Sequence, residues 1–199
     1  MSPFASEPTL TLPGWPGDLH RQYGLTVHIE ITTKRLRLRP FTVADVEPLV
    51  AILGDAETMR WYPEPYSRDG VVEWIARNMK GYERDGFGLV AVEDRNTSEF
   101  LGDCGPTIQD VEGEPHVELG WHVRRDRWGQ GIATEAGAAC RDWCWANRDV
   151  DHLISLIRPE NYQSRRVAEK LGMTVWRETI RAGFRHSVYR LDRPNPVSR

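Results

Sequence analysis

A glycine-rich turn between a predicted strand and a predicted helix constrains this chain more than any other feature. The run from Val117 to Val123 is strand-like, and the segment Trp128–Ala136 joins it to an apolar helical pattern. Gly129 and Gly131 let the backbone turn tightly without Cβ clashes. The free N–H groups that open the following helix, helped by its macrodipole, favour phosphate oxygens. The turn predicts a site for a phosphorylated ligand, although an ordinary strand-to-helix turn explains the same residues.

The usual nucleotide-binding patterns do not fit this turn. It lacks the third glycine of the dinucleotide fingerprint, and Gly131 is not followed by Lys and then Ser or Thr. No acidic residue closes a clear strand about 20 residues later, as dinucleotide binding would require. NAD and ATP are therefore poor candidates.

A second predicted strand ends at a comparable corner. Residues 151–157 are strand-like, and residues 158–161 break the pattern before a helical stretch from Ser164 to Leu171. Asn161 therefore lies where a strand passes into a helix. Together with the first turn, this order predicts two parallel strands that could splay apart with a ligand between them.

These motifs together resemble the GNAT superfamily of acyl-CoA-dependent N-acyltransferases. The similarity rests on Glu118–Trp121, Trp128–Ala136, Asn161 with Ser164, and Glu169–Met173. Within the superfamily, the chain looks most like the subgroup that acetylates ribosomal-protein N-termini. The resemblance covers residues 32–192 and implies an α/β fold. Its central sheet would be mixed and mostly antiparallel, with helices on both faces and a parallel-strand splay at the CoA site.

The resemblance also implies a set of residues that bind acetyl-CoA. The pyrophosphate would be held, mostly by backbone N–H groups, at Trp128, Gly129, Gln130, Gly131, Ile132, Ala133 and Thr134. His122 and Val123 would pair with the pantetheine amides as a neighbouring strand does. Asn161 would hydrogen-bond the pantetheine arm, and Ser164 would lie near the thioester.

A basic cluster flanks the turn. We interpret Arg124, Arg125 and Arg127 as contacts for the 3′-phosphate and pyrophosphate of CoA. A solvated loop explains the cluster equally well.

Acyl transfer requires a base for the amine, a donor for the oxyanion and an acid for the leaving thiolate. Glu118 is the expected base, acting through water and facing the acceptor, and the N–H of Val123 is the expected oxyanion donor. His116 and His122 are alternative bases, because a pKa near 6.5 suits the task. Many family members place a Tyr acid where this chain has Ala168, so Ser164 is the expected substitute. An ordinary surface glutamate is the alternative interpretation of Glu118.

An aromatic and acidic segment separates the first two predicted helices, and in the family this region forms one wall of the acceptor site. Trp61, Tyr62 and Tyr66 could enclose an acceptor while Glu57 or Glu64 attracts its ammonium group. A packed loop whose aromatic side chains close the core is the alternative. The segment Arg181–Arg185 would form the opposite wall or a dimer contact, and its arginines could instead favour an acidic acceptor.

The rest of the pattern supplies the remaining elements of the expected fold. Thr42 is expected to cap a helix over Val43–Leu53, and Ser67 to open a second one. The apolar stripe of the second helix is expected to pack in the core: Val71, Trp74, Ile75, Met79 and Tyr82. Strands are expected at residues 33–40, 88–92, 100–108, 116–123, 153–157, 174–180 and 186–191.

Composition places limits on the class of protein. With 199 residues and a net charge of −3, the chain can bury one core and lacks the basic surface of a nucleic-acid binder. Three cysteines without zinc-site spacing argue for a reduced, cytoplasmic setting and against a metal. No signal peptide or long apolar run indicates a membrane. We expect an N-terminal extension (1–30), one catalytic domain (31–193) and a short tail (194–199).

The sequence therefore predicts an acetyl-CoA-dependent N-acetyltransferase acting on a primary amine by direct transfer in a ternary complex. The acceptor is either a protein N-terminus or a small-molecule amine, and the resemblance makes a homodimer plausible. Two alternatives stay open: a catalytically silent acyl-CoA sensor, and a transferase for a larger acyl-CoA such as succinyl-CoA.

Overall fold

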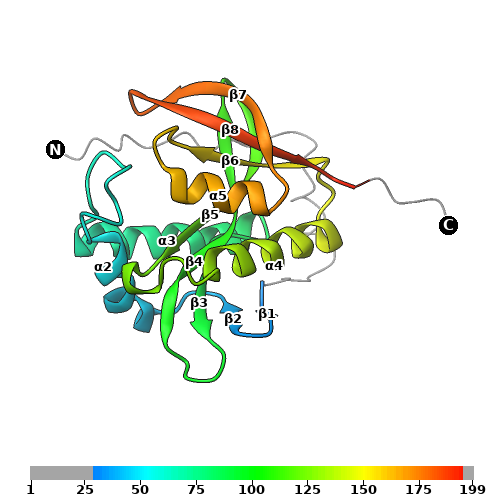
Figure 1. The fold of residues 1–199 in the computed structure, drawn as a ribbon. Coiled ribbons are helices and arrows are strands. Elements are labelled where there is room, and N and C mark those ends of the chain that lie inside the picture. Colours follow the sequence, from blue (N-terminus) through cyan, green and yellow to red (C-terminus); the bar gives the residue numbers. More distant parts are fainter. Residues whose placement is uncertain (1–28, 195–199) are drawn as a thin grey trace.

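The fold is an eight-stranded sheet covered by helices, seen in a computed structural model that describes residues 29–194 (Figure 1). Residues 1–28 of the predicted N-terminal extension and residues 195–199 of the tail lie outside the described residues. The strands are β1 (Ile31–Thr32), β2 (Leu36–Arg39), β3 (Val90–Asp94), β4 (Phe100–Val111), β5 (Glu114–Val123), β6 (His152–Ile157), β7 (Thr174–Arg181) and β8 (Phe184–Asp192). The helices are η1 (Val43–Asp45), α2 (Val46–Leu53), α3 (Arg68–Arg84), η2 (Arg125–Arg127), α4 (Ile132–Asn147) and α5 (Tyr162–Lys170).

The sheet is mostly antiparallel, with one parallel pair. Its strand order is β1-β2-β3-β4-β5-β6-β8-β7, and only β5 and β6 run parallel. A parallel pair needs a long crossover, and α4 supplies it. The predicted fold class, with its parallel splay, is confirmed.

Helices cover both faces of the sheet. Neighbouring residues on a strand point to opposite faces. On β4, Asp103 accepts a hydrogen bond from Trp74 of α3, whereas Cys104 lies against Cys140 of α4. Helices α3 and α4 therefore pack on opposite faces.

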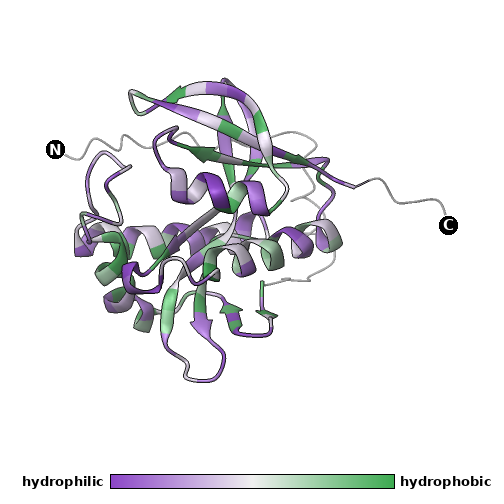
Figure 2. Cartoon of the chain, viewed as in Figure 1, coloured by the Kyte–Doolittle hydropathy of each residue, from purple (hydrophilic) through white to green (hydrophobic). Residues whose placement is uncertain are grey.

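Local sequence signals account for most of the boundaries. Ser67 caps α3 by accepting a hydrogen bond from the N–H of Gly70 at 3.1 Å, as predicted. Thr42 precedes a single 3-10 turn before α2, and its N–H donates to Asp45 at 2.7 Å. Figure 2 shows the contrast between the hydrophobic strand β6 and the mostly hydrophilic helix α5.

The predicted core stripe of α3 is correct except at one position. Val71, Ile75 and Tyr82 are buried, and Trp74 is partly buried against the core. Met79 is 42% exposed, so its assignment to the core was wrong. It falls at the edge of the stripe, where the helix turns its side chain toward solvent.

Candidate active site

The parallel strands β5 and β6 part almost as soon as they pair. Their ladder register holds only Glu118 opposite Ile154. Just beyond it, the buried hydroxyl of Ser155 donates to the carbonyl oxygen of Leu119 at 2.7 Å. The Glu118 carboxylate accepts a hydrogen bond from the N–H of Leu156 at 2.9 Å. Side chains thus replace ladder hydrogen bonds, and the strands open beyond this point.

Glu118 stands at the closed end of the opening. Burial raises the pKa of its carboxyl group, while the Leu156 N–H and the charge of Arg181 act in the opposite direction. A carboxylate with a raised pKa is a better proton acceptor than an ordinary glutamate. The residue that follows on the same face of β5 is Gly120, which adds no side chain between Glu118 and His122, and a Cβ there would meet the Leu89 side chain at 3.5 Å.

Beyond Glu118, the backbone N–H groups on one edge of β5 face β4, and those on the other edge face the opening. The N–H groups of His122 and Arg124 both face β4, where they donate to the Asp103 carboxylate at 3.1 Å and to the Leu101 carbonyl oxygen at 2.9 Å. Because peptide groups alternate along a strand, the N–H of Val123 faces the opening. Val123 therefore offers its N–H there, while its carbonyl oxygen already accepts from the Trp128 indole N–H at 2.7 Å and the N–H of His122 donates to Asp103.

The glycine turn has the features of an anion cradle. Gly129 and Gly131 adopt left-handed φ values of 74° and 78°, and a Cβ at Gly129 would meet nothing within 4 Å. Gly131 is the N-cap of α4, and no side chain makes a cap hydrogen bond there. The first-turn N–H groups are therefore left for a ligand, which fits a pyrophosphate.

An ion pair fixes the turn to the start of the sheet. The Arg35 guanidinium donates to the Glu135 carboxylate at 2.6 Å and to the carbonyl oxygen of Gln130 at 2.9 Å. The hydroxyl of Thr33 also donates to Glu135, at 2.6 Å. Glu135 lies in the first turn of α4, so this contact orients the helix N-terminus from the bend between β1 and β2.

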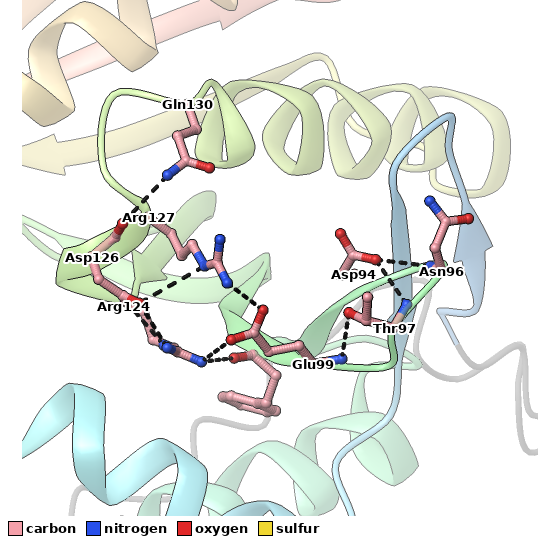
Figure 3. A network of polar contacts seen from close by, with 9 residues as sticks. Asp94, Asn96, Thr97, Glu99, Arg124, Asp126, Arg127 and Gln130 are labelled. Carbon is pink, nitrogen blue, oxygen red and sulfur yellow. Dashed lines mark hydrogen bonds and ion pairs between the residues drawn. The ribbon is translucent and has the colours of Figure 1, made fainter.

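The basic cluster beside the turn is held by acidic neighbours (Figure 3). Glu99 pairs with Arg124 at 2.7 Å and with Arg127 at 2.5 Å, and Asp126 pairs with Arg124 at 2.7 Å. Arg125 is exposed, and its nearest acidic oxygen belongs to Asp55 at 3.7 Å. Of the three arginines predicted to contact phosphate, Arg125 thus has the weakest ion pair within the protein.

Asn161 and Ser164 lie together at the start of α5. Asn161 is the N-cap, and its Oδ1 accepts from the N–H of Ser164 at 3.1 Å. The Asn161 side-chain N–H₂ group is left to donate to another acceptor. Ala168, in the position where many relatives carry a tyrosine, is fully buried.

The predicted acceptor wall brings aromatic side chains together around a buried polar chain. The Tyr62 hydroxyl lies 2.8 Å from His122 Nε2, and His122 Nδ1 lies 2.7 Å from Asp103. Tyr66 packs edge-on against Trp74 with ring centroids 5.3 Å apart, and Trp74 packs against His122 at 5.7 Å. The structure therefore joins two of the three predicted wall residues with an alternative base.

The remaining candidates lie apart from this cluster. Trp61 packs against Arg60, whose guanidinium lies 5.0 Å from the ring centroid. His116 hydrogen-bonds His152 at 2.9 Å and packs against Trp176, on a different part of β5. From the opposite side, Arg181 at the end of β7 lies close enough to lower the pKa of Tyr62, Tyr66 and Glu118 by its charge, although burial leaves each of these pKa values raised.

Sequence reasoning missed three residues of the site. Asp103, Arg35 and Glu135 carry contacts that link segments distant in the chain. Asp103 could have been recognised from the sequence. A charged residue inside the otherwise apolar strand segment Leu101–Cys104 requires a buried partner. Arg35 and Glu135 gave no such signal, since each is an ordinary surface residue of its element.

The match to known families agrees with this geometry. The family model described as an acetyltransferase (GNAT) domain matches residues 35–174. The chain belongs to the GNAT acetyltransferase family. It is an acyl-CoA-dependent N-acyltransferase.

The chain is also similar to individual proteins and solved structures. The Bacillus subtilis protein YkkB is 38% identical over 156 residues, covering 76% of this chain and 88% of YkkB. An acetyltransferase from Agrobacterium tumefaciens has a TM-score of 0.72 and 26% identity, covering 83% of this chain and 95% of its own. The ribosomal L7/L12 acetyltransferase RimL, solved in complex with coenzyme A, has a TM-score of 0.67 and 17% identity, covering 82% and 97%. The last likeness concerns the fold alone.

Two further observations concern residues 29–194 as a whole. Every helix in that range is too short or too polar to span a lipid bilayer. Within the same range, His, Cys, Asp and Glu form no group of three or more that could hold a metal ion.

Proposed function

We propose that this GNAT protein transfers the acetyl group of acetyl-CoA to a primary amine, within a ternary complex of donor, acceptor and protein. The observation that carries the proposal is the splayed β5 edge, where the Glu118 carboxylate and the inward N–H of Val123 share one opening beside the glycine turn. A nucleophile, a thioester and an oxyanion donor can meet there in one place.

The donor would be held by backbone groups. The first-turn N–H groups of α4, from Ile132 to Thr134, and the turn itself at Trp128–Gly131 would bind the pyrophosphate of acetyl-CoA. Arg124 and Arg125 would add charge for the phosphates, Asn161 would bind the pantetheine arm, and Val123 would hold the donor through its N–H at the thioester carbonyl. His122 belongs to this set through its place on β5, although its N–H faces Asp103.

Each chemical step has a residue to serve it. The amine nitrogen attacks the thioester carbon, and the N–H of Val123 stabilises the oxyanion that forms. Glu118 takes up a proton from the nitrogen through water, and collapse of the intermediate breaks the C–S bond. Ser164, on the first turn of α5, would supply a hydrogen bond or a relayed proton to the leaving thiolate.

Direct transfer is favoured over an acyl-cysteine intermediate. Cys104, Cys140 and Cys144 are all free and buried. The hydrogen bond with Cys104, and then burial, raises the pKa of Cys140, and burial raises the pKa of Cys144. Neither is therefore a thiolate nucleophile at neutral pH.

The first test is thermal unfolding with acetyl-CoA, succinyl-CoA, CoA, ATP and NAD at matched concentrations. A ligand that binds only the folded state stabilises it by about 2.7 kcal/mol at 100 times its Kd. We expect acetyl-CoA to raise Tm most, and a larger rise with succinyl-CoA would reassign the acyl group. The absence of any rise with a CoA compound would refute the proposal.

The second test is thiol release from acetyl-CoA with a panel of amines. The panel contains peptides with N-terminal Ser, Ala or Met, spermidine and kanamycin, which represent the acceptor classes considered. Turnover that is lost in Glu118→Gln and reduced in Ser164→Ala, with CoA binding retained in both, is expected. Binding of acetyl-CoA without turnover of any amine would favour a sensor instead.

The cytoplasmic location and the homodimer both stay predictions. Light scattering would measure the oligomeric state.

A further inference from the structure

We propose that the ammonium form of the acceptor loses its first proton to the Tyr62 hydroxyl, which passes its own proton to His122, an imidazole positioned by Asp103. This inference rests on the proposed acetyltransferase activity and assigns residues to a step that Glu118 does not cover. A primary amine reaches the site mostly as an ammonium ion and must lose one proton before attack and another afterwards. Glu118 and its water would serve the second proton.

The three side chains form a continuous hydrogen-bonded chain from three separate segments. Asp103 is on β4, His122 is opposite it on β5, and Tyr62 is in the segment before α3. The carboxylate lies 2.7 Å from His122 Nδ1, and Nε2 lies 2.8 Å from the Tyr62 hydroxyl. All of these distances allow direct proton transfer.

The directions of the hydrogen bonds follow from the donors around Asp103. Its carboxylate accepts from the indole N–H of Trp74 at 3.2 Å and from the backbone N–H of His122 at 3.1 Å. An acceptor of this kind fixes the proton of neutral His122 on Nδ1, so Nε2 presents a lone pair. Tyr62 must then donate to Nε2, and the remaining lone pair of its oxygen is left for an incoming ammonium group.

Exposure makes Tyr62 the contact residue of the chain. The Asp103 side chain is fully buried and that of His122 is 7% exposed, whereas Tyr62 is 40% exposed. Tyr62 is therefore the member of the chain that borders solvent, although its hydroxyl lies on the desolvated inner side, where it meets His122. Tyr62 is the catalytic residue in this scheme, and His122 and Asp103 are positioning residues.

The proton balance is complete without any other reactant. The ammonium N–H bond breaks and its proton forms a new O–H bond on Tyr62, while the phenol proton moves to His122 Nε2. The amine becomes a neutral nucleophile, and the imidazolium is stabilised by the adjacent Asp103 carboxylate. After acetyl transfer, the imidazolium returns a proton through Tyr62 to solvent.

The charges around the chain suit this role. Burial lowers the pKa of His122, but the charge and hydrogen bond of Asp103 and the charge of Glu118 outweigh it, so the pKa is raised. Burial of the phenol, followed by the charges of Glu118, Asp103 and Tyr66, raises the pKa of Tyr62, and the charge of Arg181 acts in the opposite direction. Tyr62 therefore donates its proton to His122 in the same step in which it accepts one from the ammonium group, and it does not stay ionised.

The decisive variant is Tyr62→Phe, which keeps the ring and removes the hydroxyl. With the most active amine of the panel, we expect kcat/KM to fall by about 100-fold, the usual scale for a general base. CoA binding should be unchanged, and Tm should fall only by the few degrees that loss of one hydrogen bond to buried His122 predicts. Tyr162→Phe, which removes an exposed hydroxyl on α5, is the matched control and should keep wild-type activity.

Asp103→Asn and NMR of ¹⁵N-labelled histidine supply readouts that a structural role would not produce. Loss of the carboxylate should move the acidic limb of the kcat/KM profile, and the titration midpoint of His122, to lower pH. Asp103→Glu should restore part of the shift. Tyr62→Phe should change the Nε2 resonance of the free protein.

The outcomes separate this inference from the proposed function. If wild type acetylates an amine and Tyr62→Phe does so equally well with the same pH profile, the relay is refuted and the activity stands. If His122 titrates identically in wild type, Tyr62→Phe and Asp103→Asn, the hydrogen-bonded chain is refuted even without an acceptor. If wild type acetylates no amine, the proposed function fails first.

Discussion

At the scale of the residue, Glu118 combines a structural bond with a chemical role. Its carboxylate accepts the N–H of Leu156 at 2.9 Å, and burial raises its pKa from the ordinary value of 4.5. The folded protein therefore binds this proton more tightly than the unfolded chain does. The contribution of Glu118 to stability is largest at low pH and declines as pH rises from 4.5 toward the folded-state pKa.

The substitution Glu118→Gln tests both roles at once. A glutamine keeps an acceptor for Leu156 and removes the buried charge, so we expect Tm at pH 8 to equal or exceed that of wild type. The kcat should fall by about 100-fold or more, because the base is lost. Glu83→Gln, on the exposed side of α3, is the control. A Tm that falls at pH 8 together with unchanged kcat would contradict both assignments.

At the scale of the element, the turn into α4 depends on backbone shape and not on side chains. Gly129 and Gly113 both have left-handed φ values, 74° and 88°, and at neither would a Cβ meet an atom within 4 Å. Alanine at either position should therefore cost the same strain, about 1–2 kcal/mol. Only Gly129 stands in the proposed phosphate cradle.

The pair Gly129→Ala and Gly113→Ala separates stability from binding. We expect similar losses in urea stability, measured by the unfolding midpoint. CoA affinity, measured by titration calorimetry, should fall only in Gly129→Ala, by about 10- to 100-fold, because a bond to a charged group contributes about 1.5–3 kcal/mol. Equal CoA affinity in the two variants would show that the pyrophosphate does not bind at this turn.

At the scale of the whole molecule, a buried ion network joins the first strands to the first helix. Arg39 on β2 contacts Asp45 of η1 at 2.8 Å and Glu93 of β3 at 2.5 Å. Burial alone would raise the pKa of Asp45, but the hydrogen bonds from Arg39 and Thr42, with the charge of Arg39, lower it overall. Its contribution to stability is therefore present above pH 3.8 and is lost as pH falls through the lowered folded-state pKa.

Removing Arg39 should damage the whole fold. Arg39→Met leaves two buried carboxylates unpaired, and we expect a loss of about 3–5 kcal/mol in the free energy of unfolding. Arg37→Met, two residues away, breaks only an exposed pair with Glu30 and should cost less than about 1 kcal/mol. Chemical denaturation at pH 7 measures both. Equal losses would show that exposure does not set the strength of these pairs.

Much of the fold could be predicted from local patterns. The strands from β3 to β8 follow alternating or apolar runs, and Ser67 marks the start of α3 as its side chain requires. The error at Met79 arose because helical periodicity gives the direction of a stripe but not its width. The glycine turn and Asn161, where we propose cofactor contacts, could also be located from the sequence, since both follow strand ends.

The sequence by itself determined most of the secondary structure, the glycine turn and the family, because these depend on neighbours in the chain; the expected strand 33–40, however, is two short strands, β1 and β2, separated by a bend at residues 33–35. Only the tertiary structure decided the polar contacts between distant segments. The Tyr62–His122–Asp103 chain and the Arg35–Glu135 pair each join residues far apart in sequence, 60, 19 and 100 positions. Hydrogen bonds of this kind depend on where whole elements pack, and no local periodicity encodes that placement.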